Sequence, residues 1–132
     1  MHKIRVLIID DEPDFLETIV KRLMKRKMDA TGVGSGEDAL SLIENESFDV
    51  AILDMRMPGM DGIETLKELK RKSPLTEVIM LTGHASVESG MQGMQFGAFD
   101  YMIKPADFEE LVEKVNQAGE RRRLHEERIQ KS

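Results

Sequence analysis

The sequence predicts an α/β fold in which helices cover both faces of a five-stranded parallel sheet. Five short apolar runs alternate with five longer segments whose apolar residues recur at helical spacing, which is the order typical of parallel sheets. The short runs are continuously apolar, which indicates strands buried on both faces. Right-handed crossovers leave few topologies for such a chain, and one of them is the doubly wound strand order 2-1-3-4-5. The 132 residues are enough for one domain of this kind.

The first half of the chain supplies three predicted strands and two predicted helices. The run IRVLII at 4–9 is short, rich in β-branched residues and ends in acid, as a buried strand does. A helix is expected over 14–27, and its apolar stripe consists of Phe15, Leu16, Ile19, Val20 and Leu23. A weaker strand follows at 29–33, and the residues at 35–37 open a second helix. The third strand is predicted at 49–53.

The second half of the chain continues the alternation. A loop rich in Pro and Gly spans 55–62, and the third helix after it is stopped by the Ser-Pro pair at 73–74. The remaining elements are strands at 77–81 and 100–103, a helix over 85–96 that Gly97 stops, and a last helix that begins near Asp107 with Phe108, Leu111, Val112 and Val115 facing inward.

The fourth helix has an unusual composition. Gly90 and Gly93 lie inside it, and each costs ~1 kcal/mol relative to Ala in a helix. A weak helix suits an element that shifts between two states. Met91 and Met94 have two interpretations, adaptable contacts for a partner or ordinary core residues.

Composition excludes several classes of function. The 19 basic and 25 acidic residues give a net charge of −6, so direct binding to nucleic acid is not expected. No Cys is present, which excludes disulfides and thiolate chemistry. No apolar run reaches the ~20 residues needed to cross a bilayer, and the first residues lack a signal-peptide cleavage site. We therefore expect a protein that is not exported, with other proteins, cations and small phosphorylated groups as its partners.

Polar residues with complementary chemistry stand where the predicted strands end. The residues at these ends are Asp10, Asp11 and Glu12 after the first strand, Asp54 after the third, Thr82 after the fourth and Lys104 after the fifth. Carboxyl ends of parallel strands meet at one edge of a sheet, and carboxylates this close favour a hard cation such as Mg²⁺. A lysine and a hydroxyl beside them suit a phosphoryl group. Each residue alone could be an ordinary helix cap or surface group, but their joint placement favours a site.

Four motifs resemble the receiver domain of bacterial two-component response regulators. They are IIDDE at 8–12, ILDMRMPGMDG at 52–62, MLTGHA at 80–85 and YMIKP at 101–105, and the resemblance covers about residues 3–118. It implies the flavodoxin-like (βα)5 form of the fold and a cytoplasmic signalling domain rather than an enzyme. The partner it implies is a sensor histidine kinase or a phosphotransfer protein, which would deliver a phosphoryl group from a phosphohistidine.

The resemblance also implies a role for each matching residue. Asp54 would be the phosphoacceptor, and Asp10 with Asp11 the acidic pair. The implied cofactor is Mg²⁺ or Mn²⁺, bound by Asp11, Asp54 and the main-chain oxygen of Arg56. The implied phosphoryl-binding and switch residues are Thr82 and Lys104 for the phosphoryl oxygens, Tyr101 as the aromatic whose rotamer responds, and Pro105 after a peptide bond that is usually cis in this family.

Three positions depart from the commonest pattern or vary within the family. Gly83 stands where a small Ala is usual, which keeps access to the phosphoryl group open. Arg56 and His84 occupy positions that tune the lifetime of the phosphorylated state in this family. Arginine is always charged and cannot act as a base, so we expect Arg56 to lengthen that lifetime, whereas His84 either orients water or faces solvent.

The chain is expected to relay its signal through helix 85–96, strand 100–103 and the last helix, which also form a possible homodimer surface. Residues 1–118 are expected to form the receiver domain, and residues 119–132 are almost entirely polar and charged. These last residues are either a frayed, solvated end of the helix or the start of a linker toward an output domain, in which case a role in transcription regulation follows.

Three alternative functions fit the sequence less well. A phosphatase of the haloacid-dehalogenase type needs a second Asp two residues after the nucleophile, where this chain has Arg56. A flavin-binding module needs a phosphate-binding loop after the first strand, where this chain has acids. A scaffold that is never phosphorylated would not need the complete acidic and basic set.

Overall fold

The computed structural model describes residues 3–56, 61–83 and 87–131, with the backbone alone at 87–89. Its strands are β1 (Arg5–Ile9), β2 (Asp29–Val33), β3 (Val50–Asp54), β4 (Glu77–Thr82) and β5 (Asp100–Ile103). Its helices are α1 (Pro13–Lys25), α2 (Gly36–Leu42), α3 (Gly62–Lys72), α4 (Val87–Gln95) and α5 (Phe108–Lys131). All strand pairs are parallel and follow the order β2-β1-β3-β4-β5, so the predicted fold and strand order are confirmed.

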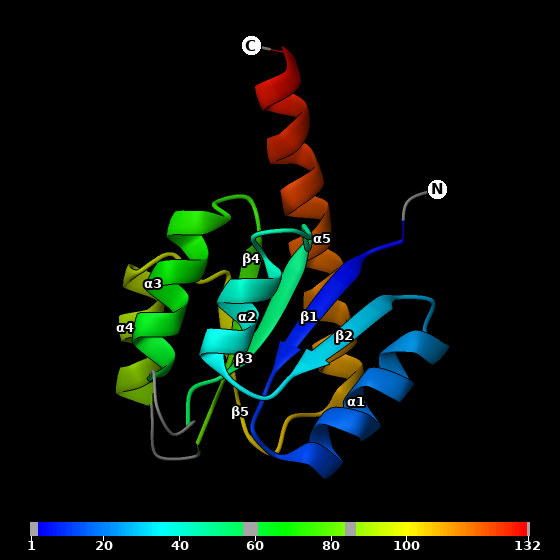
Figure 1. The fold of residues 1–132 in the computed structure, drawn as a ribbon, viewed down its shortest axis with the longest axis vertical. Helices are drawn as coiled ribbons and strands as arrows, with labels where there is room; N and C mark the ends of the chain where they lie inside the picture. Colours follow the sequence, from blue (N-terminus) through cyan, green and yellow to red (C-terminus); the bar gives the residue numbers. More distant parts are fainter. Residues whose placement is uncertain (1–2, 57–60, 84–86, 132) are drawn as a thin grey trace.

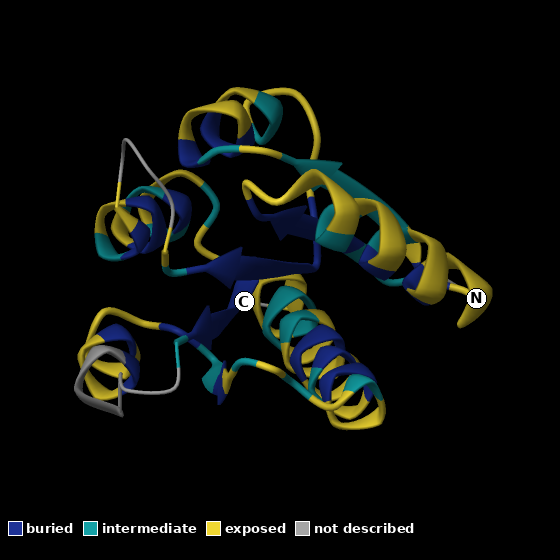
Figure 2. Ribbon diagram, turned by 90° about the horizontal axis from the view of Figure 1, so that it is seen from below, coloured by how far each residue is buried: buried dark blue, intermediate teal, exposed yellow. Residues whose placement is uncertain are grey.

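Each face of the sheet has its own apolar core. Val6 and Ile8 of β1 pack on the face covered by α1 and α5, whereas Leu7 and Ile9 pack on the face covered by α2 and α3. Successive side chains of a strand point to opposite faces, so the continuously apolar run of β1 serves both cores. Figure 2 shows the buried strands between two layers of helices whose outer surfaces are exposed. The sheet is therefore enclosed, and its carboxyl-terminal edge is left for polar residues.

The end of α1 differs from the predicted one, and the predicted start of α4 is not described. α1 ends at Lys25 rather than at residue 27, because Lys27 adopts a left-handed backbone with φ 67° and the amide of Met28 donates to the carbonyl of Leu23. α4 is described from Val87 to Gln95, and the start predicted at residue 85 lies outside the described residues. Gly97, with φ +100°, follows its end as predicted.

The glycines of α4 allow close packing on the sheet. A Cβ atom at Gly90 would lie 2.7 Å from the ring of Tyr101, and one at Gly93 would collide with Met80. The sequence indicates only a destabilising effect of these glycines on the helix, so their packing role is a finding of the structure. Met91 and Met94 are 61% and 42% exposed, so the interpretation of these residues as core is wrong.

α5 is one continuous helix that runs well past the sheet. Figure 1 shows it projecting beyond the amino-terminal ends of the strands, at the edge opposite to the strand arrowheads. Arg121 pairs with Glu77 at 3.0 Å, and Arg122 pairs with Asp49 at 3.2 Å. In the described part of the chain, no helix is both long enough and apolar enough to span a bilayer.

Candidate functional site

Three carboxylates meet at the carboxyl-terminal edge of the sheet. β1 and β3 are neighbours in register, with Ile9 beside Leu53, so Asp10 and Asp54 leave adjacent strands at the same level. One oxygen from each of Asp10, Asp11 and Asp54 lies within 4.8 Å of the others. Asp10 and Asp54 are buried, at 1% and 6% exposure, whereas Asp11 is exposed. The cavity in front of them measures ≈ 420 Å³ and is lined by Asp10, Asp11, Glu12, Asp54, Arg56, Gly83 and Lys104.

Hydrogen bonds orient the two buried carboxylates. Oδ1 of Asp10 accepts from the amide of Glu12 at 2.9 Å, and Oδ1 of Asp54 accepts from the amide of Arg56 at 3.1 Å. The Oδ2 atoms face Lys104, whose Nζ lies 3.0 Å from that of Asp10 and 3.6 Å from that of Asp54. Each carboxylate is thus held by one main-chain amide and shares one ammonium group.

The surroundings of Asp54 and Lys104 shift the pKa values of both side chains. Burial raises the pKa of Asp54, and the nearby charge of Asp10 adds to this, although the Arg56 amide and Lys104 oppose it. Burial lowers the pKa of the Lys104 ammonium, but its hydrogen bond to Asp10 and the negative charges of Asp54 and Asp10 outweigh burial and raise the pKa. Lys104 is therefore a permanent cation beside a carboxylate that gains from a second positive charge.

The donor set fits a small, hard cation. Oxygen ligands from three carboxylates, with no sulfur or imidazole among them, are the ligands that Mg²⁺ and Mn²⁺ prefer. Lys104 pairs with two of the three acids, Asp10 and Asp54, so a divalent ion would relieve the remaining repulsion among them. The main-chain oxygen of Arg56 belongs to the same turn, whose amide already contacts Asp54.

Thr82 and Tyr101 lie behind the cavity rather than in its lining. Thr82 is fully buried, and its hydroxyl donates a long hydrogen bond of 3.5 Å to the carbonyl of Met102. Tyr101 is half-buried on β5, and its ring lies against Gly90 of α4. The two residues therefore connect the cavity edge of β4 to β5 and α4. The Lys104–Pro105 peptide bond is cis.

Arg56 and Gly83 form part of the cavity wall. The exposed side chain of Arg56 packs over Gly83, where an added Cβ atom would lie 3.0 Å from its Cζ. The small residue at position 83 thus makes room for the guanidinium group. His84, predicted at the same entrance, lies outside the described residues.

One neighbour of this site was not predicted from the sequence. Nζ of Lys104 lies 4.7 Å from the centroid of the Phe15 ring. Helical periodicity predicts only that Phe15 faces the sheet, and no motif links it to a lysine 89 positions later. The half-buried ring is both a core side chain and a contact of the ammonium group.

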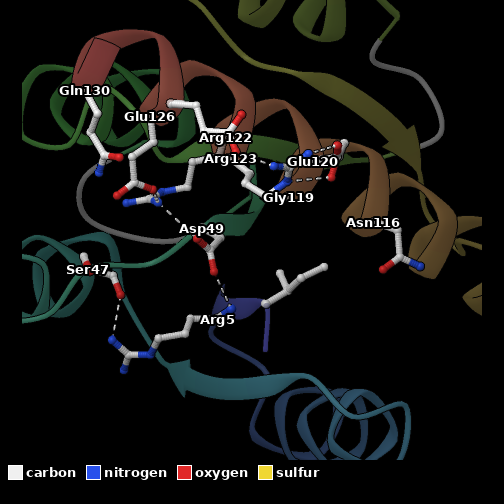
Figure 3. Close-up of a pocket in the computed structure, with 12 residues that line it drawn as sticks. Arg5, Ser47, Asp49, Asn116, Gly119, Glu120, Arg122, Arg123, Glu126 and Gln130 are labelled. Carbon is white, nitrogen blue, oxygen red and sulfur yellow. Dashed lines mark hydrogen bonds and ion pairs between the residues drawn. The ribbon is translucent and has the colours of Figure 1, made fainter. Parts of the chain in front are cut away.

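A larger cavity of ≈ 810 Å³ lies at the opposite edge of the sheet, beside the extended part of α5. Figure 3 shows Asp49 between the main-chain amide of Arg5 and the guanidinium of Arg122. The described acids and arginines of this cavity pair with one another, including Arg123 with Glu120 and Glu127. The pairs of Arg123 lie within α5, whereas the pair of Arg122 with Asp49 attaches α5 to the start of β3.

Curated proteins similar in sequence to this chain are transcriptional regulators. The transcriptional regulatory protein ZraR of Salmonella typhimurium is 36% identical over 116 residues, which are 88% of this chain and 26% of that protein. The DNA-binding transcriptional regulator NtrC of Klebsiella pneumoniae is 35% identical over 111 residues, which are 84% of this chain and 24% of that protein. The chain therefore spans about a quarter of the length of these curated relatives.

Two solved receiver domains are similar over nearly their whole length. The receiver domain of the Francisella response regulator 1452 has a TM-score of 0.84 and 34% identity, covering 90% of this chain and 98% of that one. A response regulator receiver domain protein from Clostridium thermocellum has a TM-score of 0.87 and 35% identity, covering 92% and 98%. A family model of the response regulator receiver domain matches residues 6–116. This match covers most of the chain and agrees with the fold, so the chain belongs to the response regulator receiver domain family.

Proposed function

We propose that this chain is a phosphorylation switch in which Asp54 accepts a phosphoryl group from the phosphohistidine of a sensor histidine kinase or a phosphotransfer protein. The observation that carries the proposal is the position of the Asp54 carboxylate. It lies in an open cavity, within 4.8 Å of two further acids, and 3.6 Å from the ammonium of Lys104. No other described group of acids in the chain gathers three carboxylates in this way.

The proposed transfer is an in-line displacement at phosphorus. A carboxylate oxygen of Asp54 bonds to phosphorus while the bond between phosphorus and the donor's imidazole nitrogen breaks, and the nitrogen keeps the bonding electrons. Lys104 stabilises the negative charge on the phosphoryl oxygens. Water later attacks the same phosphorus atom, which releases inorganic phosphate and restores the carboxylate.

Asp10, Asp11, Asp54 and the main-chain oxygen of Arg56 are the proposed holders of Mg²⁺ or Mn²⁺. The bound ion supplies positive charge that offsets both the carboxylates and the incoming phosphoryl group. Asp10 also keeps Lys104 in place through the 3.0 Å ion pair. The pKa of Asp54 is raised chiefly by burial and further by the charge of Asp10, and a bound cation would oppose both effects.

Thr82 and Tyr101 are the proposed switch residues. The hydroxyl of Thr82 gives up only a long hydrogen bond when it turns toward a phosphoryl oxygen. The space it leaves would admit the ring of Tyr101, whose contact with Gly90 links that motion to α4. The output surface proposed is therefore the face formed by α4, β5 and α5, where a partner or a second copy of the chain would bind.

Arg56 is proposed to prolong the phosphorylated state, together with a tuning role for His84. The Arg56 guanidinium lines the cavity beside Gly83, from where it would pair with the phosphoryl group and cover the path of attacking water. Arginine offers donors but no basic atom near neutral pH. It would therefore shield the acyl phosphate without activating water.

Residues 1–118 are proposed as the receiver domain and residues 119–132 as a helical link toward an output domain. Two observations support a link: α5 continues to Lys131, and the chain spans about a quarter of transcriptional regulators such as ZraR. We propose a transcription regulator as the whole protein, with this domain binding proteins rather than nucleic acid or membranes.

Intact mass measurement tests the proposed function. The protein is incubated with Mg²⁺ and acetyl phosphate, and the expected result is a mass gain of one phosphoryl group that Asp54→Asn abolishes. Omission of Mg²⁺ should also abolish the gain. An unchanged mass in the parent protein, or an equal gain in Asp54→Asn, would contradict the proposal.

A further inference from the structure

The ammonium group of Lys104 has an aromatic neighbour as well as acidic ones. Its Nζ lies 4.7 Å from the centroid of the Phe15 ring, 3.0 Å from Asp10 and 3.6 Å from Asp54. The face of an aromatic ring carries partial negative charge and attracts a cation at this distance. The lysine is thus held by the two carboxylates and by a ring from α1.

Such a contact matters because a lysine side chain is flexible. Its four-carbon stem has many rotamers, and the Lys104 side chain remains 30% exposed. Ordering a charged group before reaction lowers the cost of ordering it in the transition state. The Phe15 ring would help to order the side chain of Lys104 by keeping its ammonium group at the edge of the cavity.

Phe15 is itself fixed. It lies in the first turns of α1, which begins at Pro13, and it packs against the core between α1, α5 and the sheet. It also lines a groove of ≈ 410 Å³ together with Lys104 and Pro105. The ring therefore has a stable position beside the lysine stem.

We propose that Phe15 is a positioning residue for phosphoryl transfer, holding the Lys104 ammonium where it meets the incoming phosphoryl oxygens. This inference rests on the proposed function of Asp54 as the acceptor. When the phosphoryl group arrives, the ammonium exchanges its carboxylate contacts for a phosphoryl oxygen while it stays over the ring face. Phe15 contacts no reacting atom and acts through Lys104.

The same groove contains a matched control. Phe108 also lines it, but the Phe108 ring lies under Arg22, with the guanidinium carbon 3.9 Å from its centroid. Both phenylalanines are half-buried and pack against the same core. Phe108→Leu therefore removes an aromatic ring from the groove without removing the one under Lys104.

The test uses Phe15→Leu, Phe15→Tyr and Phe108→Leu in the full chain with saturating Mg²⁺. The first measurement is the NMR chemical shift of the Lys104 ε-methylene protons, which a ring face moves upfield. The second is the initial rate of phosphorylation by acetyl phosphate, followed by intact mass. We expect Phe15→Leu to lose the upfield shift and to slow phosphorylation about fivefold, whereas Phe15→Tyr and Phe108→Leu keep both near the parent values.

Two results would overturn the inference. One is an unchanged Lys104 shift in Phe15→Leu, and the other is a rate loss in Phe15→Leu no larger than in Phe108→Leu. Thermal midpoints are recorded for all variants, and Phe15→Met replaces Phe15→Leu if the latter does not fold. A parent protein that takes up no phosphoryl group contradicts the proposed function, whereas the proton shift still decides separately whether the ring holds the ammonium.

Discussion

At the scale of single residues, the site concentrates negative charge and provides too little positive charge to balance it. Asp10 and Asp54 are buried, Asp11 stands beside them, and Lys104 is the cation that pairs with the two buried acids. Burial of ionised carboxylates costs free energy unless cations or hydrogen bonds compensate. We therefore expect a bound cation to stabilise the site.

Asp54→Asn is expected to raise the free energy of unfolding at neutral pH in Mg²⁺-free buffer. Burial raises the pKa of Asp54 in the folded protein above its value in the unfolded chain. Asp54 therefore contributes most to the free energy of unfolding at a pH below its unfolded pKa, where it is protonated. This contribution is lost as the pH rises through the folded pKa. The benefit of the Asn substitution should therefore shrink as the pH falls toward about 4. Urea unfolding of the parent and Asp54→Asn at neutral pH and near pH 4 measures this difference in the free energy of unfolding. A variant less stable than the parent at neutral pH would contradict the expectation.

Mg²⁺ is expected to stabilise the fold. At ten times its dissociation constant, an ion that binds only the folded state adds about 1.4 kcal/mol, which corresponds to a rise of about 4 °C in Tm for a domain of this size. Asp11→Asn should lose most of this gain, whereas Glu113→Gln, an exposed acid on α5, should keep it. Equal gains in both variants would mean that the ion binds elsewhere.

Arg56→Asn is expected to shorten the life of the acyl phosphate by about two- to tenfold, the effect of losing one hydrogen bond of ordinary strength, about 0.5–1.5 kcal/mol. The decay of phosphorylated protein is followed by intact mass at fixed Mg²⁺ concentration. Arg128→Asn removes an exposed arginine from the far end of α5 and serves as the control. Equal or slower decay in Arg56→Asn would leave Arg56 without a shielding role.

At the scale of elements, α5 is attached to the sheet by ion pairs beyond the apolar core. Its last buried residues are Ala118 and Gly119. Beyond them, Arg121 pairs with Glu77, the first residue of β4, and Arg122 pairs with Asp49, which directly precedes β3. Glu77 also lies 3.6 Å from Lys70 of α3. These contacts direct the helix away from the sheet along a defined path, which is a useful property for an element proposed to connect two domains.

Arg122→Ala is expected to lower the free energy of unfolding by about 1–3 kcal/mol, because it leaves the buried Asp49 carboxylate with less compensation. Arg123→Ala removes a neighbouring arginine whose pairs with Glu120 and Glu127 are exposed, and it should cost no more than about 0.5 kcal/mol. Urea unfolding of both variants measures the two losses in the free energy of unfolding. Similar losses would show that burial of the Asp49 pair has no special effect.

The elements also show what the sequence could predict. Most strand positions followed from the apolar runs, because a short run that is continuously apolar is typical of a strand buried on both faces. The strand order was one of the few that right-handed crossovers allow. The packing of Gly90 on Tyr101 did not follow, since helix propensity reports on the helix alone and not on its neighbour. The contacts of Arg121 and Arg122 with β4 and β3 were missed for a similar reason: a charged helical segment looks solvated until its partners are known.

The candidate site was likewise predictable from the sequence only in part. The motifs and the strand order together predicted that the three acids and Lys104 would converge, and they lie in one cavity. The Phe15 contact with Lys104 and the packing of Arg56 over Gly83 depend on side-chain direction across elements distant in sequence. Such contacts leave no periodic signal, so one sequence cannot reveal them.

At the scale of the whole molecule, the two edges of the sheet carry different groups of charged residues. The carboxyl-terminal edge holds the acids and Lys104, and the opposite edge holds the ion pairs of α5, as the strand arrowheads and the projecting helix in Figure 1 indicate. β4 and β5 connect the cavity to α4. Thr82 at the end of β4 donates to the carbonyl of Met102 in β5, and the ring of Tyr101 in β5 lies against Gly90 of α4. We propose that a phosphoryl group on Asp54 changes the packing of α4 and β5.

Amide hydrogen exchange with and without beryllium fluoride and Mg²⁺ tests this claim most directly, because beryllium fluoride mimics a phosphoryl group on a carboxylate. We expect altered exchange over residues 87–103, little change over β2 and α2, and no response in Asp54→Asn. Identical exchange over 87–103 in the parent protein, with the mimic bound at Asp54, would contradict the claim.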